Sequence, residues 1–363
     1  MGIHRPGRLV PGLALVLVAS ALPAAEREAE RHSFRADRLH VRNLIGQVSV
    51  EGHAGPGFEV EVRFGGADHT PDRLRVDTRD GRDASVEIVF PIEESRRYVY
   101  PRLGGGETSF DLDRTGSWLS NLLGTGKRIE VSGDGSGLEL WADVTVRVPS
   151  GASLRVEHGV GEIAASGIGA DLELVLRSGQ VRAERIDGNL SVDTGSGAVH
   201  VETVRGAVLV DTGSGDVSVR DCVGDNVVVD TGSGSVEVEN IEAHRFVVDT
   251  GSGDVRAHDV GADDVDVDTG SGSVEIDLAK LSSGSVVVDT GSGRIRLGVP
   301  AGASAEIHAD TGSGGIRVDM TQGYDTIRQD RDEMVLRIGS GSARVTLDTG
   351  SGGIRVSDSG TGS

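Results

Sequence analysis

The chain has 363 residues, including 55 Gly, 9 Pro and 1 Cys, and only 3% of the residues are aromatic. Glycine is about twice as frequent as average, but no three-residue glycine period exists, which excludes a collagen-like chain. Acidic residues outnumber basic ones by 57 to 36, giving a formal net charge of −21. A chain this acidic repels phosphate backbones, so we expect no nucleic-acid partner and favour cations or basic surfaces.

Residues 1–25 have the layout of a secretory signal peptide. Arg5 and Arg8 charge the start, an apolar run follows from Leu9 to Ala21, and small residues lead to Ala25. The run is too short for a comfortable transmembrane helix, and no second long apolar stretch follows. We therefore expect an exported protein, periplasmic, envelope-associated or secreted, with no integral membrane segment in the mature chain. An uncleaved N-terminal anchor is the alternative.

Residues 26–156 predict divergent β-strands around an insertion. Val86 to Phe90 and Trp141 to Val148 alternate as strands do. Between them, residues 91–137 contain two prolines and three consecutive glycines, which favours a loop insertion near the N-terminal end. We expect one short helix in it, around residues 117–123.

Residues 157–356 contain an internal repeat. The pentapeptide Asp-Thr-Gly-Ser-Gly occurs eight times, and successive copies lie 18, 19, 19, 19, 21, 21 and 38 residues apart. We interpret the spacing of 38 as two periods, with a degenerate copy at 339–341 between them. The copies begin at Asp193, Asp211, Asp230, Asp249, Asp268, Asp289, Asp310 and Asp348.

Apolar columns flank every copy. The residues three and one before the Asp, and six and eight after it, are apolar in all copies, and most are β-branched. This period of two is typical of strands, and two short strands cannot bury their own inner face, so the units must stack. The prediction is an all-β fold: a single-stranded parallel β-solenoid (β-helix) with rungs of about 19 residues. A smaller insertion is expected at 320–333, and a disordered polar tail at 357–363.

The repeated aspartates invite a catalytic interpretation, because apolar-Asp-Thr-Gly-Ser is the active-site pattern of aspartic proteases. Those enzymes need two loops that face each other, whereas tandem copies form a row of carboxylates. We therefore expect no catalytic residue and no cofactor: each Asp caps its own turn, and the Thr and Ser hydroxyls bond locally. The alternative is a ladder of structural calcium ions, which would relieve repulsion along the row. Its ligands would be Asp193, Asp211, Asp230, Asp249, Asp268, Asp289 and Asp310.

Two sets of residues are candidates for an interaction surface. Apolar residues two before the Asp should point outward, where they could dock a partner: Leu209, Val228, Val247 and Val287. Ordinary strand propensity explains this column equally well. Aromatic residues near the insertion are the other candidates: Tyr98, Tyr100 and Trp118. Cys222 shares an inward column with Val204, Ile241 and Val260, so we expect a buried, inert thiol.

The tandem Val-x-Val-Asp-Thr-Gly-Ser-Gly-x-Val-x-Val units resemble the bacterial adhesin-like DUF4097 family, and so does the lead-in over residues 143–156. The resemblance covers about 35–356 and implies an envelope-associated β-solenoid, without supplying functional residues. The hypothesis is a non-enzymatic adhesin or surface interaction module that contacts a protein or glycan partner. The alternatives are an envelope-stress accessory or scaffold without its own ligand, and a polysaccharide-acting β-helix enzyme.

Overall fold

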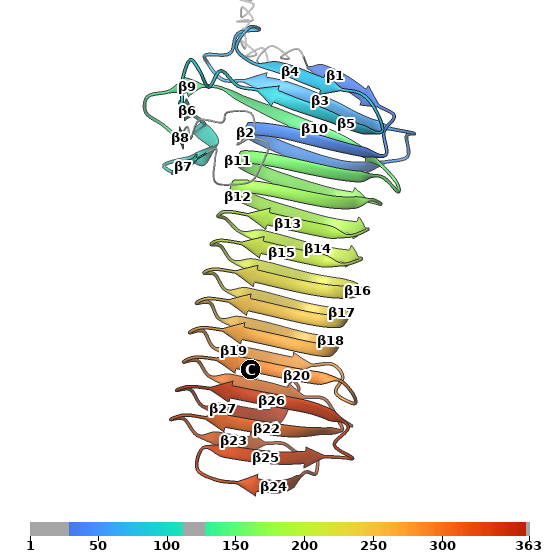
Figure 1. Cartoon of the computed structure of the whole chain (residues 1–363), viewed down its shortest axis with the longest axis vertical. Helices are drawn as coiled ribbons and strands as arrows, with labels where there is room; N and C mark the ends of the chain where they lie inside the picture. The colour runs from blue at the N-terminus through green and yellow to red at the C-terminus, as the bar shows by residue number, and fades with distance from the viewer. Residues whose placement is uncertain (1–28, 112–127, 361–363) are drawn as a thin grey trace, which may run out of the picture.

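The structure is a computed structural model and describes residues 29–111 and 128–360. Strands stack one above another into a long column that is broader at its N-terminal end (Figure 1). Among the described residues the only helix is a three-residue 3-10 turn, η1 (Pro101–Leu103). The predicted all-β class is confirmed. The proposed signal peptide and the helix expected near 117–123 lie outside the described residues.

A repeat consists of the strand that leads into the Gly-Ser-Gly turn and the strand that leaves it. Strand β15 (Val208–Thr212) pairs in parallel with β16 (Val217–Thr231), which pairs in parallel with β17 (Val236–Thr250). Along each strand, buried residues alternate with more exposed ones. Each unit therefore buries its Val and Ile side chains against the coil above and the coil below, as the alternating pattern requires.

The strand after the turn bends at a corner where residues other than glycine adopt a left-handed backbone. On successive coils this residue is Arg185, Thr203, Asp221, Asn240 or Asp259, with φ between 54° and 59°. Asn and Asp tolerate this conformation best, whereas a β-branched Thr is strained in it. The Asn240 amide also donates a hydrogen bond of 2.5 Å to the Asp221 carboxylate on the coil before it.

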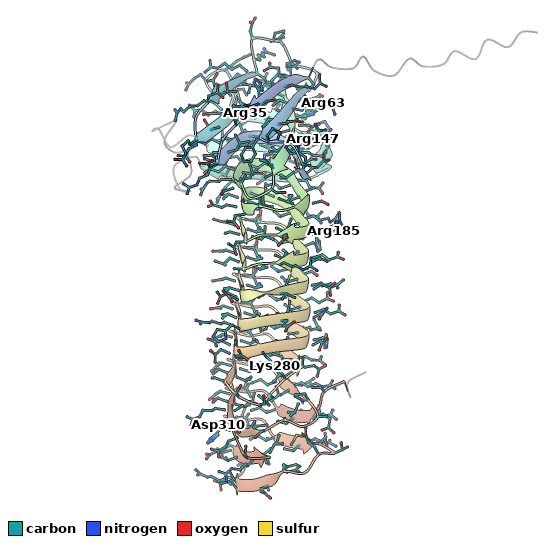
Figure 2. The ribbon with its side chains drawn as sticks, turned by 90° about the vertical axis from the view of Figure 1, so that its right-hand side faces the viewer. Arg35, Arg63, Arg147, Arg185, Lys280 and Asp310 are labelled. Carbon is teal, nitrogen blue, oxygen red and sulfur yellow. The ribbon has the colours of Figure 1, made fainter. Side chains whose placement is uncertain are left out.

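The other strands of the central stack follow the same pattern. They are β11 (Ser153–Ile168), β12 (Asp171–Asp187), β13 (Leu190–Thr194), β14 (Val199–Arg205), β18 (Val255–Thr269), β19 (Val274–Leu278), β20 (Ser285–Thr290) and β21 (Ile295–Val299). Strand β11 runs across residue 156, and a single apolar core extends from Phe34 to Val356. Charged side chains project outward along the whole column (Figure 2).

At the C-terminal end, spatial order departs from chain order. The strands there are β22 (Ala305–Thr311), β23 (Ile316–Asp319), β24 (Asp325–Gln329), β25 (Glu333–Ile338), β26 (Ala343–Thr349) and β27 (Ile354–Asp358). Strand β26 pairs in parallel with β20 on one side and with β22 on the other, so Asp348 lies between Asp289 and Asp310. Strand β27 lies between β21 and β23 in the same way.

The interpretation of the spacing of 38 is therefore wrong. The stretch around Gly339 and Gly341 is a turn, not a degenerate coil, and the last copy of the repeat inserts between the two copies that precede it. This insertion is possible because all copies carry the same apolar columns, so each copy can pair with any other. Strand β27 also includes residues 357 and 358, which the sequence assigns to the polar tail.

Antiparallel strands close this end of the stack. Strand β25 pairs antiparallel with β22, and β24 pairs antiparallel with β25. The hairpin comprises most of the insertion expected at 320–333. Its outer strand β24 is exposed throughout, carries charged residues and has a register irregularity between Thr326 and Arg328. These are features by which sheet edges avoid pairing with other chains.

The N-terminal end is closed in a comparable way. Its strands are β1 (Glu30–Phe34), β2 (Arg38–His53), β3 (Phe58–Gly65), β4 (Arg75–Arg79), β5 (Asp83–Val89) and β10 (Trp141–Pro149). Strand β2 pairs in parallel with β5, β10 and β11, so it lies between segments that come much later in the chain. Antiparallel strands β3 and β4 then cover β10 and β5, and β1 covers β3.

The stretch 91–137 is not simply a loop. Its described residues, with β9, form a small second sheet from β6 (Arg97–Val99), β7 (Glu107–Asp111), β8 (Arg128–Ser132) and β9 (Leu138–Glu139). Arg102 fixes this sheet to the column through two hydrogen bonds of 2.9 Å to Asp143, and its guanidinium lies over the Trp141 ring. Phe110, Ile129 and Val131 are buried on one face of this small sheet. The sequence did not predict the sheet, because the prolines and glycines of this stretch are typical of a loop.

Candidate functional site

One outer surface of the column combines apolar and acidic residues, and we call it the aspartate face. It lies on the strands that lead into the turns, where the Asp and the residue two before it both point outward. Register places these residues in two adjacent columns on successive coils. One column contains Leu209, Val228, Val247, Asp266 and Val287, and the other contains Asp211, Asp230, Asp249, Asp268 and Asp289.

The apolar column of this face reaches solvent. Leu209 is 47% exposed and Val287 is 38% exposed, whereas Val228 and Val247 are half-buried. Leu209 and Val287 are two of only five large apolar side chains that are exposed among the described residues. The outward orientation expected for this column is what the structure shows.

The aspartates form an exposed row, one per coil. Partial burial, followed by repulsion from neighbouring carboxylates of the aspartate face, raises the pKa of Asp211, Asp230, Asp268 and Asp289. None of these four carboxylates accepts a hydrogen bond from a described residue, so the expectation that each Asp caps its own turn is wrong for them. The row relieves its repulsion by pointing into water, which screens it.

The neighbouring threonine has the structural role instead. The Thr residues that follow the aspartates are all buried. The Thr269 hydroxyl donates to the Gly253 carbonyl of the coil before it at 3.0 Å and accepts from the Gly272 N–H of its own turn at 3.0 Å. The same pair of bonds recurs at Thr290, Thr311 and Thr349. From Thr231 onward, the hydroxyl rather than the carboxylate therefore ties each turn to its neighbour.

Other aspartates do cap turn amides, but on the next coil. Asp216 accepts from the Ser235 N–H at 2.9 Å, and Asp254 accepts from the Ser273 N–H at 3.0 Å. Both follow the pentapeptide aspartate by five residues. On successive coils this fifth position is Asp216, Ser235, Asp254 and Ser273. The alternation of Asp and Ser, just outside the repeated pentapeptide, was the sequence signal for this capping.

A metal site does not form from the described part of the chain. No three His, Cys, Asp or Glu side chains within it come together as ligands. In the aspartate row each coil contributes a single carboxylate, which is fewer oxygen ligands than calcium requires unless several coils share an ion. A calcium ladder along this row is therefore not part of the function proposed below.

The predicted aromatic surface is wrong for the two tyrosines. Tyr98 is 1% exposed and Tyr100 is 2% exposed, because they pack in the interface between the small sheet and the column. The Tyr98 ring lies edge-on to Phe90, and Tyr100 contacts Trp141. Neither can offer a ring to a sugar. Trp118 lies outside the described residues.

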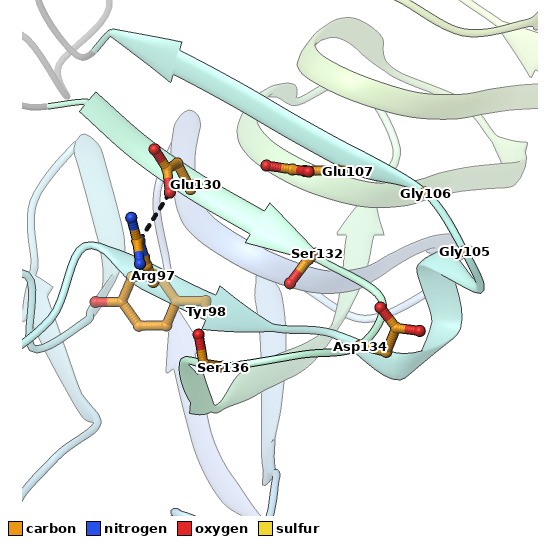
Figure 3. Close-up of a pocket in the computed structure, with 9 residues that line it drawn as sticks. All are labelled: Arg97, Tyr98, Gly105, Gly106, Glu107, Glu130, Ser132, Asp134 and Ser136. Atoms are coloured by element: carbon orange, nitrogen blue, oxygen red, sulfur yellow. Dashed lines mark hydrogen bonds and ion pairs between the residues drawn. The ribbon is translucent and has the colours of Figure 1, made fainter.

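The small sheet carries a polar hollow of about 310 Å³ between β6, β7 and β8 (Figure 3). Arg97 pairs with Glu130 at 2.9 Å at its edge, and the other polar side chains around it come from Glu107, Ser132, Asp134 and Ser136. Among the described residues, no hydrogen bond joins either serine to a histidine, the arrangement that activates a serine nucleophile.

Cys222 is fully buried. It pairs in register with Val204 and Ile241, as the columns predicted, and burial raises the pKa of its thiol to about 11. A thiol that stays protonated at neutral pH is a poor nucleophile.

Comparison with known proteins decides the family. The model of the Toastrack DUF4097 family matches residues 141–357, which is more than half of the chain. The chain belongs to the Toastrack DUF4097 family. This confirms the resemblance noted for the repeated units. No match was found among curated proteins.

Two solved structures are similar to this Toastrack chain at low identity. One is a "putative cell adhesion protein" from Clostridium sporogenes ATCC 15579, with 11% identity and a TM-score of 0.18, covering 91% of this chain and 99% of that one. The other is a "putative adhesin" from Bacteroides fragilis NCTC 9343, with 10% identity and a TM-score of 0.32, covering 91% and 97%. Similarities this low give no information on function.

The Toastrack match runs from β10 to β27 and so includes every coil of the aspartate face. The small sheet with its polar hollow lies outside the matched residues. None of the helices in the described part of the chain is long and apolar enough to cross a membrane.

Proposed function

We propose that this Toastrack chain is an exported, non-enzymatic interaction module whose aspartate face binds a cationic, partly apolar surface of another protein. The observation that carries the proposal is a column of mostly apolar residues, exposed at Leu209 and Val287 and interrupted by Asp266, which runs beside a row of carboxylates. On contact, the apolar side chains would be removed from water, and the carboxylates would favour a partner of opposite charge.

The charge of the row favours a basic partner. Partial burial, and then the neighbouring aspartates, raise the pKa of Asp230 and Asp289, so a cationic side chain placed between the aspartates would relieve an existing repulsion. A net charge of −21 adds long-range attraction for a basic surface and repels an acidic one. An anionic glycan is therefore a poor partner for this face.

The test measures binding of an extended peptide of alternating Lys and Leu to the full chain, at physiological salt. We expect saturable binding that weakens at least tenfold in the double variant Leu209→Ser/Val287→Ser. The matched control is Val223→Ser, because Val223 is 50% exposed but lies outside the aspartate face. Equal binding by the double variant and the control, or no saturable binding, would contradict the proposal and favour a scaffold without its own ligand.

Export is the second part of the proposal and rests on residues 1–25. N-terminal sequencing of the protein from the culture medium or envelope should give a chain that begins shortly after Ala21 or Ala25. A cytoplasmic protein that retains Arg5 and Arg8 would refute it.

A further inference from the structure

Arginines cluster on the strands that leave the turns, whereas the aspartate face lies on the strands that lead into them. Because β27 inserts between β21 and β23, Arg296, Arg355 and Arg317 lie side by side on three consecutive coils. Adjacent coils are about 4.8 Å apart. Arg294 stands two residues before Arg296, directly ahead of β21, and we call these four residues the arginine cluster.

The cluster is short of anions. Glu275 pairs with Arg296 at 3.1 Å, and Asp319 is shared by Arg317 at 2.8 Å and Arg355 at 3.0 Å. Ion pairs thus link three of the four guanidinium groups to two carboxylates, and no ion pair joins Arg294 to a described residue. Elsewhere in these outward columns, arginines are better matched: Arg220, for example, contacts both Glu237 and Glu239.

One guanidinium of the cluster is also incompletely satisfied. The Arg296 side chain is 27% exposed, and its Nε lies buried without a hydrogen-bond acceptor. A buried donor without an acceptor is unfavourable, and an oxyanion that reaches it would remove that penalty.

A hollow adjoins these groups. It has a volume of about 390 Å³, and the residues that line it include Arg294, Arg296, Arg355, Glu275 and Gly353. Gly353 leaves this space open, because a Cβ there would meet only the Gly315 carbonyl at 3.4 Å; on the next coil, a Cβ on Gly315 would meet nothing within 4 Å. On this coil and the next, no side chain occupies the position that Arg294 fills on its own coil.

We propose that the arginine cluster binds a small oxyanion that carries two or more negative charges, such as a diphosphate or a dicarboxylate group. Guanidinium forks bind phosphate and carboxylate oxygens through paired N–H donors, and two coils present such forks about 5 Å apart. The excess of positive charge extends over only three coils, and Asp277 adjoins it as the register partner of Gly298 on β21. The site therefore suits a compact anion rather than a long polyanion.

The test is isothermal titration of the full chain with sodium pyrophosphate and, separately, with sodium succinate, at constant ionic strength. We expect one saturable site for at least one of these anions; the tighter of the two identifies phosphate or carboxylate chemistry. In Arg355→Gln the affinity should fall at least tenfold. The control Arg220→Gln removes a similarly exposed arginine from the same kind of strand and should bind as the parent does.

A second variant separates loss of the site from loss of charge. Gly353→Leu keeps all four arginines but fills the hollow, so binding should again fall at least tenfold while the melting temperature is retained. The proposal is overturned if neither anion binds saturably, or if Arg355→Gln and Gly353→Leu bind as tightly as Arg220→Gln. Binding by the aspartate face is unaffected by either result, because the two sites share no residue.

Discussion

Within each repeat, Asp and Thr are neighbours that point to opposite sides of the strand and therefore act differently. The aspartate is exposed and repels its counterparts, whereas the threonine is buried and, at Thr269, Thr290, Thr311 and Thr349, its hydroxyl makes two hydrogen bonds to glycines. The pentapeptide thus combines a structural residue with a surface residue.

Removal of one threonine hydroxyl tests this division. Thr290→Val keeps the side-chain shape but leaves the Gly272 carbonyl and the Gly293 N–H without their partner. We expect the free energy of unfolding in urea to fall by about 2 kcal/mol or more. Asp289→Asn is the control and should cause no loss. A stable Thr290→Val together with a destabilised Asp289→Asn would reverse the assignment.

Burial and repulsion along the aspartate row make the stability of the fold depend on pH, and the direction of that dependence follows from the pKa of Asp230. Burial, and then Asp211 and Asp249, raise the pKa of Asp230, so the folded state holds this proton to a higher pH than the unfolded state does. The stability linked to this proton is present at low pH and is lost as pH rises through the folded-state pKa.

Asp230→Asn should therefore be slightly more stable than the parent at pH 7, by no more than about 1 kcal/mol in this solvent-screened position. The difference should shrink as pH falls below the ordinary carboxyl range, near about 4. Urea unfolding of both proteins at several pH values measures it. A less stable Asp230→Asn at pH 7 would mean that this carboxylate makes a favourable contact.

The corner residues provide a test of backbone strain. Thr203 has φ of 59°, a conformation that a β-branched residue adopts at a cost. Thr203→Gly should raise the free energy of unfolding by roughly 1 kcal/mol. Thr346→Gly, at an exposed strand position, should instead lower it. Equal losses in both variants would show that the corner is not strained.

At the scale of the strands, chain order and spatial order agree in the middle of the stack and differ at both ends. Strand β26 lies between β20 and β22, and β2 lies between β10 and β11. Each end is then covered by antiparallel strands. Segments far apart in sequence must therefore meet before either end can close, so neither end is a simple continuation of the repeat.

Cysteine cross-linking tests the position of β26. Thr346 is the register partner of Val287 on one side and of His308 on the other. In a Cys222→Val background, Thr346→Cys should form a disulfide with Val287→Cys and, separately, with His308→Cys. The pair Val287→Cys and His308→Cys should not, because two coils separate their Cα atoms by about 10 Å. A disulfide between Val287→Cys and His308→Cys would mean that β20 and β22 are direct neighbours, as chain order would have them.

The sequence predicted the strands and their inward columns because period-two alternation reports burial directly. It did not predict where the last copy inserts, since identical columns allow every copy to pair with any other. The arginine cluster depends on that insertion, because only Arg296 and Arg317 would be neighbours if chain order held. The burial of Tyr98 and Tyr100 was also hidden, because the small sheet that covers them lies in a stretch rich in Pro and Gly.

At the scale of the whole molecule, one apolar core continues from the N-terminal strands through the stack to β27. Charged and acidic residues cover its outside, so the column presents different surfaces on its two kinds of strand. The strands before the turns carry the aspartate face, and those after the turns carry ion pairs and, at one end, the arginine cluster. A single scaffold thereby holds two surfaces of opposite charge.

The most direct test of this account is a set of distances along the aspartate row, measured by pulsed electron paramagnetic resonance between pairs of spin labels. In a Cys222→Val background, Asp193→Cys is combined in turn with a cysteine at Asp268, Asp289, Asp348 or Asp310, which follow it by four, five, six and seven coils. The account predicts mean distances of about 19, 24, 29 and 34 Å in that order. Distances that do not increase by a constant step, or a label at Asp310 that lies nearer than one at Asp348, would contradict it.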